Sequence, residues 1–267
     1  RKELISGAGA AKKWCLIGCG VPSQDTTFLP SIAAFELFKE LGGSYAISWR
    51  MVDLYVNDKY VGLYMLTEKV EINKERININ SAEFTTEGTT SRTVNKNTGD
   101  IAPEEQAILD TGIQEFKYSP DAVVVTDGGY VIEAGYYYND AACGFKTRKG
   151  ISFELKEPEY VSLEQMARIT AYVQDYEDAL YSETGYNSKG KHYSDYLDLE
   201  SAARLFLVDS FIGNKDMYVT STYLCIDGDA DGLKGKLTSG PAWDYNFYEL
   251  NSNLYGRNST GMGAFSW

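Results

Sequence analysis

Histidine and cysteine are scarce in this chain of 267 residues, which has one histidine and four cysteines. A Ser-His-Asp hydrolase needs an imidazole as its base, and only His192, in a turn-like stretch, could supply one. Cys15 and Cys19 are not followed by a second close pair, so neither a zinc-binding spacing nor a disulfide framework is expected. We interpret the cysteines as buried or incidental thiols and His192 as a surface residue.

Basic residues are outnumbered, and long apolar runs are missing. The chain has 25 Lys and Arg against 38 Asp and Glu, a net charge of −13 and an isoelectric point near 4.6. Such a chain repels polyanions, so nucleic acid is excluded as a partner. No apolar run approaches the roughly 20 residues that cross a bilayer, so no membrane insertion is expected. With 43% hydrophobic residues, the composition is that of a soluble globular chain with a core.

The hydrophobic periodicity predicts an α+β fold, with a mainly β first half that holds one helix and a helical second half that holds a small hairpin. Helices are expected over 31–41, 162–180 and 199–212, and strands over 49–56, 60–70, 122–126, 130–137, 151–155, 218–226 and near 236–237. Asn57-Asp58-Lys59 and Asp127-Gly128-Gly129 are predicted as hairpin turns. The polar segment 84–120, nearly devoid of apolar residues over 85–99, is expected to be an exposed insertion or mobile loop.

Two acidic residues stand where a predicted rigid element ends, which is where catalytic groups concentrate. Asp216 follows the helix predicted over 199–212, and Asp244 follows the last strand. If the intervening hairpin folds back, one carboxylate can accept a hydroxyl proton while the other holds Mg²⁺. The alternative is that both are ordinary turn residues. The Asp-rich stretch 227–232 resembles part of a calcium loop, but Thr238 stands where the bidentate glutamate belongs, which favours a plain hairpin turn.

Several segments resemble the CotH kinase-like family, first known from bacterial spore coats, and they follow one another along the chain in the order that this family has. The specific ones are the hairpin followed by Leu66-Thr-Glu-Lys69 and the segment Gly240-Pro-Ala-Trp-Asp244. Others are Gly129-Tyr-Val-Ile-Glu133, Leu155-Lys-Glu-Pro-Glu159 and Asn214-Lys-Asp216. The resemblance spans nearly the whole chain apart from the polar insertion.

The resemblance implies an atypical protein-kinase-like, two-lobe fold without a glycine-rich loop. Residues 1–158 would form the N-lobe and 159–267 the C-lobe of a single domain, with further pieces expected beyond both ends. The implied activity is ATP- and Mg²⁺-dependent transfer of the γ-phosphate to Ser or Thr hydroxyls of extracellular or spore-coat-type proteins. The implied location is extracellular or at the cell surface.

The resemblance also implies roles for eight residues. Asp216 resembles the catalytic aspartate, with Asn214 orienting its loop, and Asp244 resembles the magnesium ligand, with Asn246 beside it in the motif. Four further polar residues in matched segments are expected either to contact nucleotide or to form a lysine–glutamate pair: Glu68, Lys69, Glu133 and Lys156. A surface ion pair is the equally weighted alternative for each of these four.

The sequence departs from the family pattern at positions that bear on activity. Pro30-Ser31 stands where relatives carry Arg-Asn, Cys19 where they often have Asn, and Asn246 where they have a second aspartate. Loss of an arginine removes a bidentate phosphate contact, and Asp to Asn removes a charge from a metal site. The second hypothesis is therefore a catalytically silent kinase-like module for binding or adhesion. Its partner would be a carbohydrate or a surface protein, because the 21 tyrosines of the chain would suit a surface that contacts carbohydrate. A hydrolase built on paired carboxylates is the third.

Overall fold

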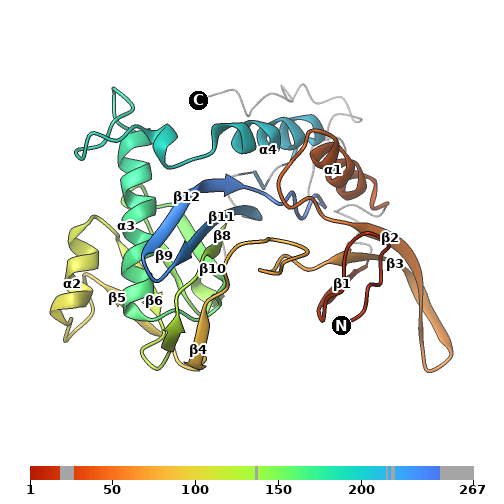
Figure 1. Cartoon of the computed structure of the whole chain (residues 1–267), viewed down its shortest axis with the longest axis horizontal. Helices are drawn as coiled ribbons and strands as arrows, with labels where there is room; N and C mark the ends of the chain where they lie inside the picture. The colour runs from red at the N-terminus through yellow and green to blue at the C-terminus, as the bar shows by residue number, and fades with distance from the viewer. Residues whose placement is uncertain (19–26, 136–137, 215, 218–219, 247–267) are drawn as a thin grey trace. The chain divides into compact units, whose positions relative to one another are not determined.

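The computed structural model of the chain describes residues 1–18, 27–135, 138–214, 216–217 and 220–246 (Figure 1). The chain forms two compact units. The first unit comprises Arg1–Asn78, Glu200–Thr222 and Ser239–Trp267, and the second comprises Ile79–Leu199 and Tyr223–Thr238. Each unit thus combines segments from both halves of the chain, so their composition differs from that of the two expected lobes, whose assignment stays a prediction.

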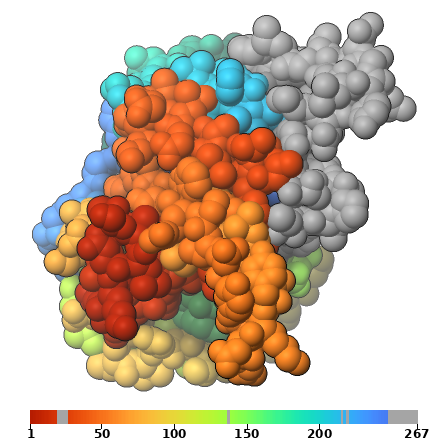
Figure 2. Space-filling model, turned by 90° about the vertical axis from the view of Figure 1, so that its right-hand side faces the viewer, coloured from red at the N-terminus to blue at the C-terminus, as the bar shows by residue number. Residues whose placement is uncertain are grey.

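The first unit contains an antiparallel sheet of order β1-β3-β2, formed by β1 (Trp14–Ile17), β2 (Trp49–Val56) and β3 (Lys59–Glu68). The β2–β3 hairpin confirms the prediction for 49–70. Asn57 and Asp58 both have positive φ, at 50° and 62°, as a tight two-residue turn between twisted strands requires. The tip of the hairpin projects from its sheet, and Tyr55 and Tyr60 are 60% and 58% exposed there (Figures 1 and 2).

Two helices of the first unit share a core. They are α1 (Leu29–Glu40) and α4 (Leu199–Ile212), and both confirm predicted helices. Ala34 and Phe38 of α1 and Val208 of α4 are fully buried in one cluster with Ala242 and Tyr245. The segment that carries Asp244 is therefore fixed by apolar neighbours on both sides of that aspartate.

The second unit is built on a sheet of seven strands in the order β12-β11-β8-β10-β9-β6-β5. In chain order these are β5 (Arg92–Asn95), β6 (Glu115–Tyr118), β8 (Tyr130–Ala134), β9 (Gly144–Lys146), β10 (Ser152–Glu157), β11 (Thr222–Asp229) and β12 (Gly232–Ser239). A separate pair joins β4 (Glu83–Thr86) to β7 (Val123–Thr126), and short 3₁₀ turns span Tyr138–Asp140 and Tyr193–Asp195.

The long helix α3 (Leu163–Leu180) packs against this sheet, and α2 (Pro103–Asp110) lies near β5 and β6 (Figure 1). Met166 and Ile169 of α3 are fully buried in one core with Tyr130 and Ile132 of β8. Ser162 caps α3 by accepting from Gln165 N, and Gln165 Oε1 accepts from Ser162 N in return. This is the predicted capping box. With four helices and mainly β structure in its described residues, the chain has a mixed α and β fold.

Most of residues 85–99 are exposed, as expected of an exposed insertion, but the segment 84–120 is not a loop. Its residues form β4, β5, α2 and β6, and Val94 is fully buried. An edge strand needs few inward apolar side chains, so Val94 suffices for β5. The polar groups of the segment are satisfied by a partner distant in sequence, because Asp121 accepts hydrogen bonds from the backbone and hydroxyl groups of Thr89 and Thr90.

The predicted hairpin through Asp127-Gly128-Gly129 is also wrong, although both of its strands exist. β7 pairs with β4, whereas β8 pairs with β10 and neighbours β11. Asp127 is held by Gln165 and Arg168 of α3, and Gly129 N donates to Asn80 O at 2.8 Å. The tripeptide therefore passes from one sheet to the other instead of reversing the chain.

Candidate functional site

Asp216 is positioned by a short chain of hydrogen bonds that begins at the end of α4. Gly213, with φ 73°, ends the helix as its sequence predicted, and its N–H donates to Asp209 O. Asn214 Nδ2 donates to Asp209 Oδ1 at 3.0 Å, and Asn214 Oδ1 accepts from Asp216 N at 3.1 Å. The structure therefore places Asn214 where it orients the backbone of Asp216.

Asp244 is positioned by the rigid segment that precedes it and by a hydroxyl from the loop after Asp216. Trp243 stacks on Phe35 of α1, with ring centroids 6.2 Å apart. Asp244 itself has φ 62°, a conformation that non-glycine residues rarely adopt. Ser221 Oγ donates to Asp244 Oδ2 at 3.2 Å. Asn246 lies half-buried in the turn just beyond.

The two predicted acids interact. Burial raises the pKa of the Asp216 carboxyl above its ordinary value, and the negative charge of Asp244 raises it further. Burial also raises the pKa of Asp209, against hydrogen bonds from Asn214 and Tyr245 that favour its ionised form. Asp216 and Asp244 are thus two half-buried carboxylates that repel one another, and Asn214 links the buried Asp209 to the backbone of Asp216.

Glu68 and Lys69 lie in the first unit at the end of β3, and Glu68 is paired with an arginine that sequence reasoning missed. Arg76 Nη1 lies 2.6 Å from Glu71 Oε1, and its Nε lies 3.6 Å from Glu68 Oε1. The Arg76 side chain is only 3% exposed. Burial raises the pKa of Glu68, while a hydrogen bond from Ser48 N and the charge of Arg76 oppose the rise.

Arg76 also fixes the backbone around Lys69. Its guanidinium donates to Lys69 O at 3.2 Å and to Lys13 O at 2.8 Å, and it lies over the Trp14 ring at 4.9 Å. A small cavity of about 100 Å³ opens here, lined by Glu68, Lys69 and Arg76 among others. In the sequence Arg76 stands in a polar stretch rich in Glu, Lys and Asn, which does not distinguish it from a surface residue.

Glu133 and Lys156 lie in the second unit, on β8 and β10, and form an ion pair. Lys156 Nζ lies 2.9 Å from Glu133 Oε2 and 3.4 Å from Glu154 Oε2. Glu154 stands directly opposite Glu133 in the strand register, and it is a residue that the sequence did not single out. Burial lowers the pKa of Lys156, but the two glutamates outweigh burial and raise it overall. Burial also raises the pKa of Glu154.

Glu133 and Lys156 thus form an ion pair, which is compatible both with the lysine–glutamate pair of a kinase-like site and with the surface ion pair predicted as the alternative. Glu133 is buried, whereas the Lys156 side chain is 36% exposed. An ammonium group with that exposure can reach a ligand.

Comparison with protein families decides the relationship. The family described as CotH kinase protein matches residues 2–261, which is nearly the whole chain. The chain belongs to the CotH family. Comparison with curated proteins and with solved structures gave no significant match. Within the described residues of this CotH protein, no helix is long and apolar enough to cross a membrane.

Membership of the CotH family suggests nucleotide and metal use in general. Within the described part of the chain, no group of three or more His, Cys, Asp or Glu side chains converges as a preformed metal cage. The donor set at Asp216 and Asp244 nevertheless fits Mg²⁺, which binds through one or two carboxylates and completes its octahedron with water and substrate phosphates. Repulsion between the two carboxylates would be relieved by a divalent cation.

The departures of this CotH chain from the family pattern have definite places. Pro30 and Ser31 occupy the first turn of α1 and are both buried, so neither could replace an arginine that reaches a phosphate. Cys19 lies outside the described residues.

Proposed function

We propose that the chain is an ATP- and Mg²⁺-dependent phosphotransferase that phosphorylates Ser or Thr hydroxyls of protein substrates, on a two-lobe kinase-like fold. The observation that carries this proposal is the nearness of Asp216 to Asp244, close enough for the two carboxylates to repel one another although they lie 28 positions apart and come from the ends of different elements. Membership of the CotH family supports it.

Phosphoryl transfer needs positioning and charge neutralisation more than an unusual nucleophile. In the proposed step Asp216 accepts the proton of the substrate hydroxyl, whose oxygen bonds to the γ-phosphorus while the bond to the β,γ-bridging oxygen breaks and ADP leaves. The raised pKa of Asp216 makes it a stronger base than an exposed aspartate. Asn214 keeps this carboxylate in place through the backbone.

Asp244 and Asn246 would hold Mg²⁺, which would neutralise charge on the phosphates. Ser221 orients the Asp244 carboxylate through its hydroxyl. For the nucleotide we propose a contact from Lys69, which lies in the same unit as Asp216 and Asp244, with Glu68 as the carboxylate beside it. A role for Lys156 and Glu133 of the second unit stays a prediction.

The proposed substrates are extracellular or spore-coat-type proteins, in keeping with the association of the CotH family with spore coats. The second candidate is a catalytically silent module that binds a carbohydrate or a surface protein. It is favoured by the buried Pro30-Ser31 pair and by the exposed Tyr55 and Tyr60, whose ring centroids are 5.4 Å apart on the hairpin tip.

The test is a thermal-unfolding titration with ATP and Mg²⁺, followed by transfer of labelled phosphate to an acidic Ser-rich protein. Ligand binding to the folded state raises the unfolding temperature. We expect Asp244→Ala to abolish the shift and Asp216→Ala to keep the shift but abolish transfer. Asp231→Ala, at an exposed turn, is the matched control and should change neither. No shift at millimolar nucleotide, or transfer that survives Asp216→Ala, would refute the proposal.

A further inference from the structure

A large groove lies in the second unit, in the part of the chain that was predicted to be a loop. Its volume is about 890 Å³, and it is formed by α2, the ends of β5 and β6, and Lys146 at the end of β9. The aliphatic side chains of Ile101, Leu109 and Ile113 supply its apolar lining. None of the residues that we identify as the candidate catalytic site belongs to it.

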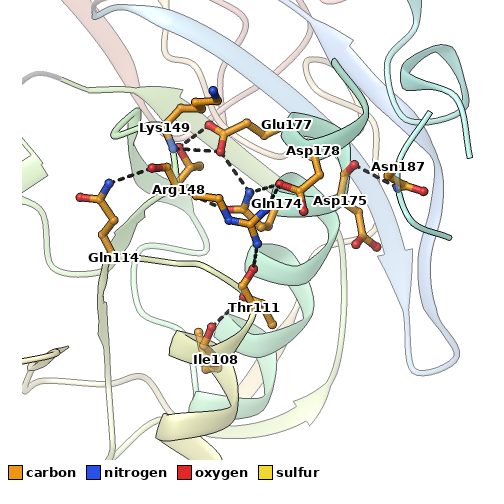
Figure 3. A network of polar contacts seen from close by, with 11 residues as sticks. Ile108, Thr111, Gln114, Arg148, Lys149, Gln174, Asp175, Glu177, Asp178 and Asn187 are labelled. Atoms are coloured by element: carbon orange, nitrogen blue, oxygen red, sulfur yellow. Dashed lines mark hydrogen bonds and ion pairs between the residues drawn. The ribbon is translucent and has the colours of Figure 1, made fainter. Parts of the chain in front are cut away.

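One wall of the groove is fixed from behind by a polar network (Figure 3). Arg148 Nη2 donates to Thr111 O at 2.6 Å, and Arg148 Nη1 lies 2.6 Å from Asp178 Oδ1 of α3. Gln114 Nε2 donates to Arg148 O at 2.9 Å. Gly112, with φ 106°, passes so close to the Arg148 guanidinium that a Cβ would collide with it. The groove is therefore preformed rather than dependent on its ligand.

The network is anchored by a buried carboxylate. Glu177 of α3 is 5% exposed and accepts from Thr147 Oγ1 at 2.5 Å and from Lys149 N at 3.1 Å. Gln174 bridges it to the rest of the network by accepting from Arg148 N and donating to Glu177 Oε2. These bonds hold the turn between β9 and β10 against α3, and with it Lys146.

The chemistry of the groove is unusual for so acidic a protein. Lys96 and Lys146 both line it, and among the described residues neither ammonium group forms an ion pair. Glu115, which faces Lys146 across the strands, is hydrogen-bonded instead by Asn95 Nδ2 at 2.7 Å. Two lysines against one carboxylate make the lining net positive in a chain of net charge −13.

The remaining polar lining consists of carboxamides, which donate and accept as a peptide group does. Asn97 and Gln106 are exposed on the rim, and Gln114 lies on the fixed wall. Among the described residues, no aromatic ring lines the groove for a sugar to stack on. Aliphatic contacts, amide partners and unpaired ammonium groups together fit an extended polypeptide with acidic side chains and occasional aliphatic ones.

We propose that this groove is a docking site for acidic segments of the protein substrate. That the bound peptide belongs to the substrate rests on the proposed phosphotransferase function. That the groove binds an acidic peptide does not depend on that function. The probe is a fluorescently labelled peptide of repeated Ser-Glu-Glu-Leu. A Ser-Lys-Lys-Leu peptide and polygalacturonate are the comparison ligands. Binding to the full chain is measured by fluorescence polarisation at several salt concentrations.

We expect the acidic peptide to bind best, with an affinity that salt weakens, and Lys96→Gln/Lys146→Gln to lower the affinity about tenfold. Lys236→Gln, at an exposed lysine outside the groove, is the matched control and should leave it unchanged. Equal affinity in the double variant, or tighter and lysine-dependent binding of polygalacturonate, would overturn the proposal.

Transfer kinetics separate this proposal from the proposed function. If the chain transfers phosphate, the double variant should raise KM for an acidic protein substrate about tenfold and leave kcat and KM for ATP unchanged. An unchanged KM for the protein overturns docking while the phosphotransferase stands. Lysine-dependent peptide binding without any transfer refutes the phosphotransferase and leaves a peptide-binding groove.

Discussion

Replacement of Arg76 by methionine should destabilise the first unit strongly and in a pH-dependent way. Methionine keeps much of the apolar stem but removes the cation that faces Glu68 and Glu71, whose side chains are only 5% and 9% exposed. Loss of one partner of a buried ion pair costs about 3–5 kcal/mol, because the remaining charge is left without compensation. We expect a loss of unfolding free energy in this range near neutral pH.

The sign of the pH dependence follows from the direction of the pKa shift. Burial already raises the pKa of Glu68 with Arg76 present, and loss of the guanidinium removes a charge that opposes the rise. A carboxyl whose pKa is higher in the folded than in the unfolded state favours folding at low pH, and this gain is lost as the pH rises through the folded pKa. The variant should therefore recover part of its stability when the pH is lowered from about 7 to about 5.

Tryptophan fluorescence during urea unfolding measures this effect selectively, because the second unit contains no tryptophan. Arg50→Met, at an exposed residue of β2, is the matched control and should change stability by no more than about 0.5 kcal/mol. The triple variant Glu68→Gln/Glu71→Gln/Arg76→Met should be more stable than Arg76→Met alone, since it leaves no buried charge. An equal loss at both pH values, or a triple variant no better than the single one, would refute this reasoning.

Two further predictions concern the second unit. Hydrogen bonds from Arg92 hold the pKa of Glu105 at about 2, so the stabilisation by this pair is present above about pH 4.5 and lost as the pH falls toward 2. Acid unfolding followed by far-ultraviolet circular dichroism should show a flatter pH dependence for Glu105→Gln than for the unmodified chain. Ser162→Ala removes the cap of α3 and should cost about 1 kcal/mol of unfolding free energy in urea; no loss would mean that the capping box contributes nothing.

Local signals in the sequence were enough to predict the hairpin and three of the four helices of the described chain. The β2–β3 turn depends on Asn57 and Asp58, and the start of α3 on Ser162 and Gln165, all of which lie next to the elements they define. The remaining helix, α2, lies in the segment where apolar periodicity is weak, and only Glu105 and Ile108 of its residues are buried.

The errors have a common cause in partners that are distant along the chain. β5 is stable as a strand because β6 pairs with it, which the Thr- and Asn-rich sequence around Val94 does not indicate. Asp127 was interpreted as a turn residue, yet it is bound by Arg168 and Gln165 about 40 positions later. Turn propensity describes what a tripeptide allows, and the distant partners decide which of the allowed conformations forms.

The candidate site likewise contains residues that the sequence could predict and residues that it could not. Asp216 and Asp244 were predictable because each follows the end of an element, but the support from Asp209 and Ser221 was not, since neither stands in a recognisable spacing. Lys156 and Glu133 form an ion pair, which fits both the site role and the surface ion pair that the sequence left open for them. The roles of these residues in transfer stay predictions.

The pKa shifts of several acidic residues fall into two groups. Where a carboxylate fastens a loop, as at Glu105 or Asp121, donors lower its pKa, and the charged form is the one that the fold stabilises. Where a carboxylate lies at or beside a predicted site residue, as at Glu68, Glu154 and Asp216, burial raises its pKa.

Raised pKa values mean that the folded chain holds these charges at a cost, and a fold retains such a cost where a ligand of opposite charge can offset it. For Asp216 the cost comes from burial and, in addition, from the charge of Asp244, so a divalent cation bound by Asp244 would cancel the second contribution and leave the effect of burial on the pKa of Asp216. Asp216 would remain ionised and free to accept a proton. One carboxylate would then act as the base while the other holds the metal ion, as phosphoryl transfer requires.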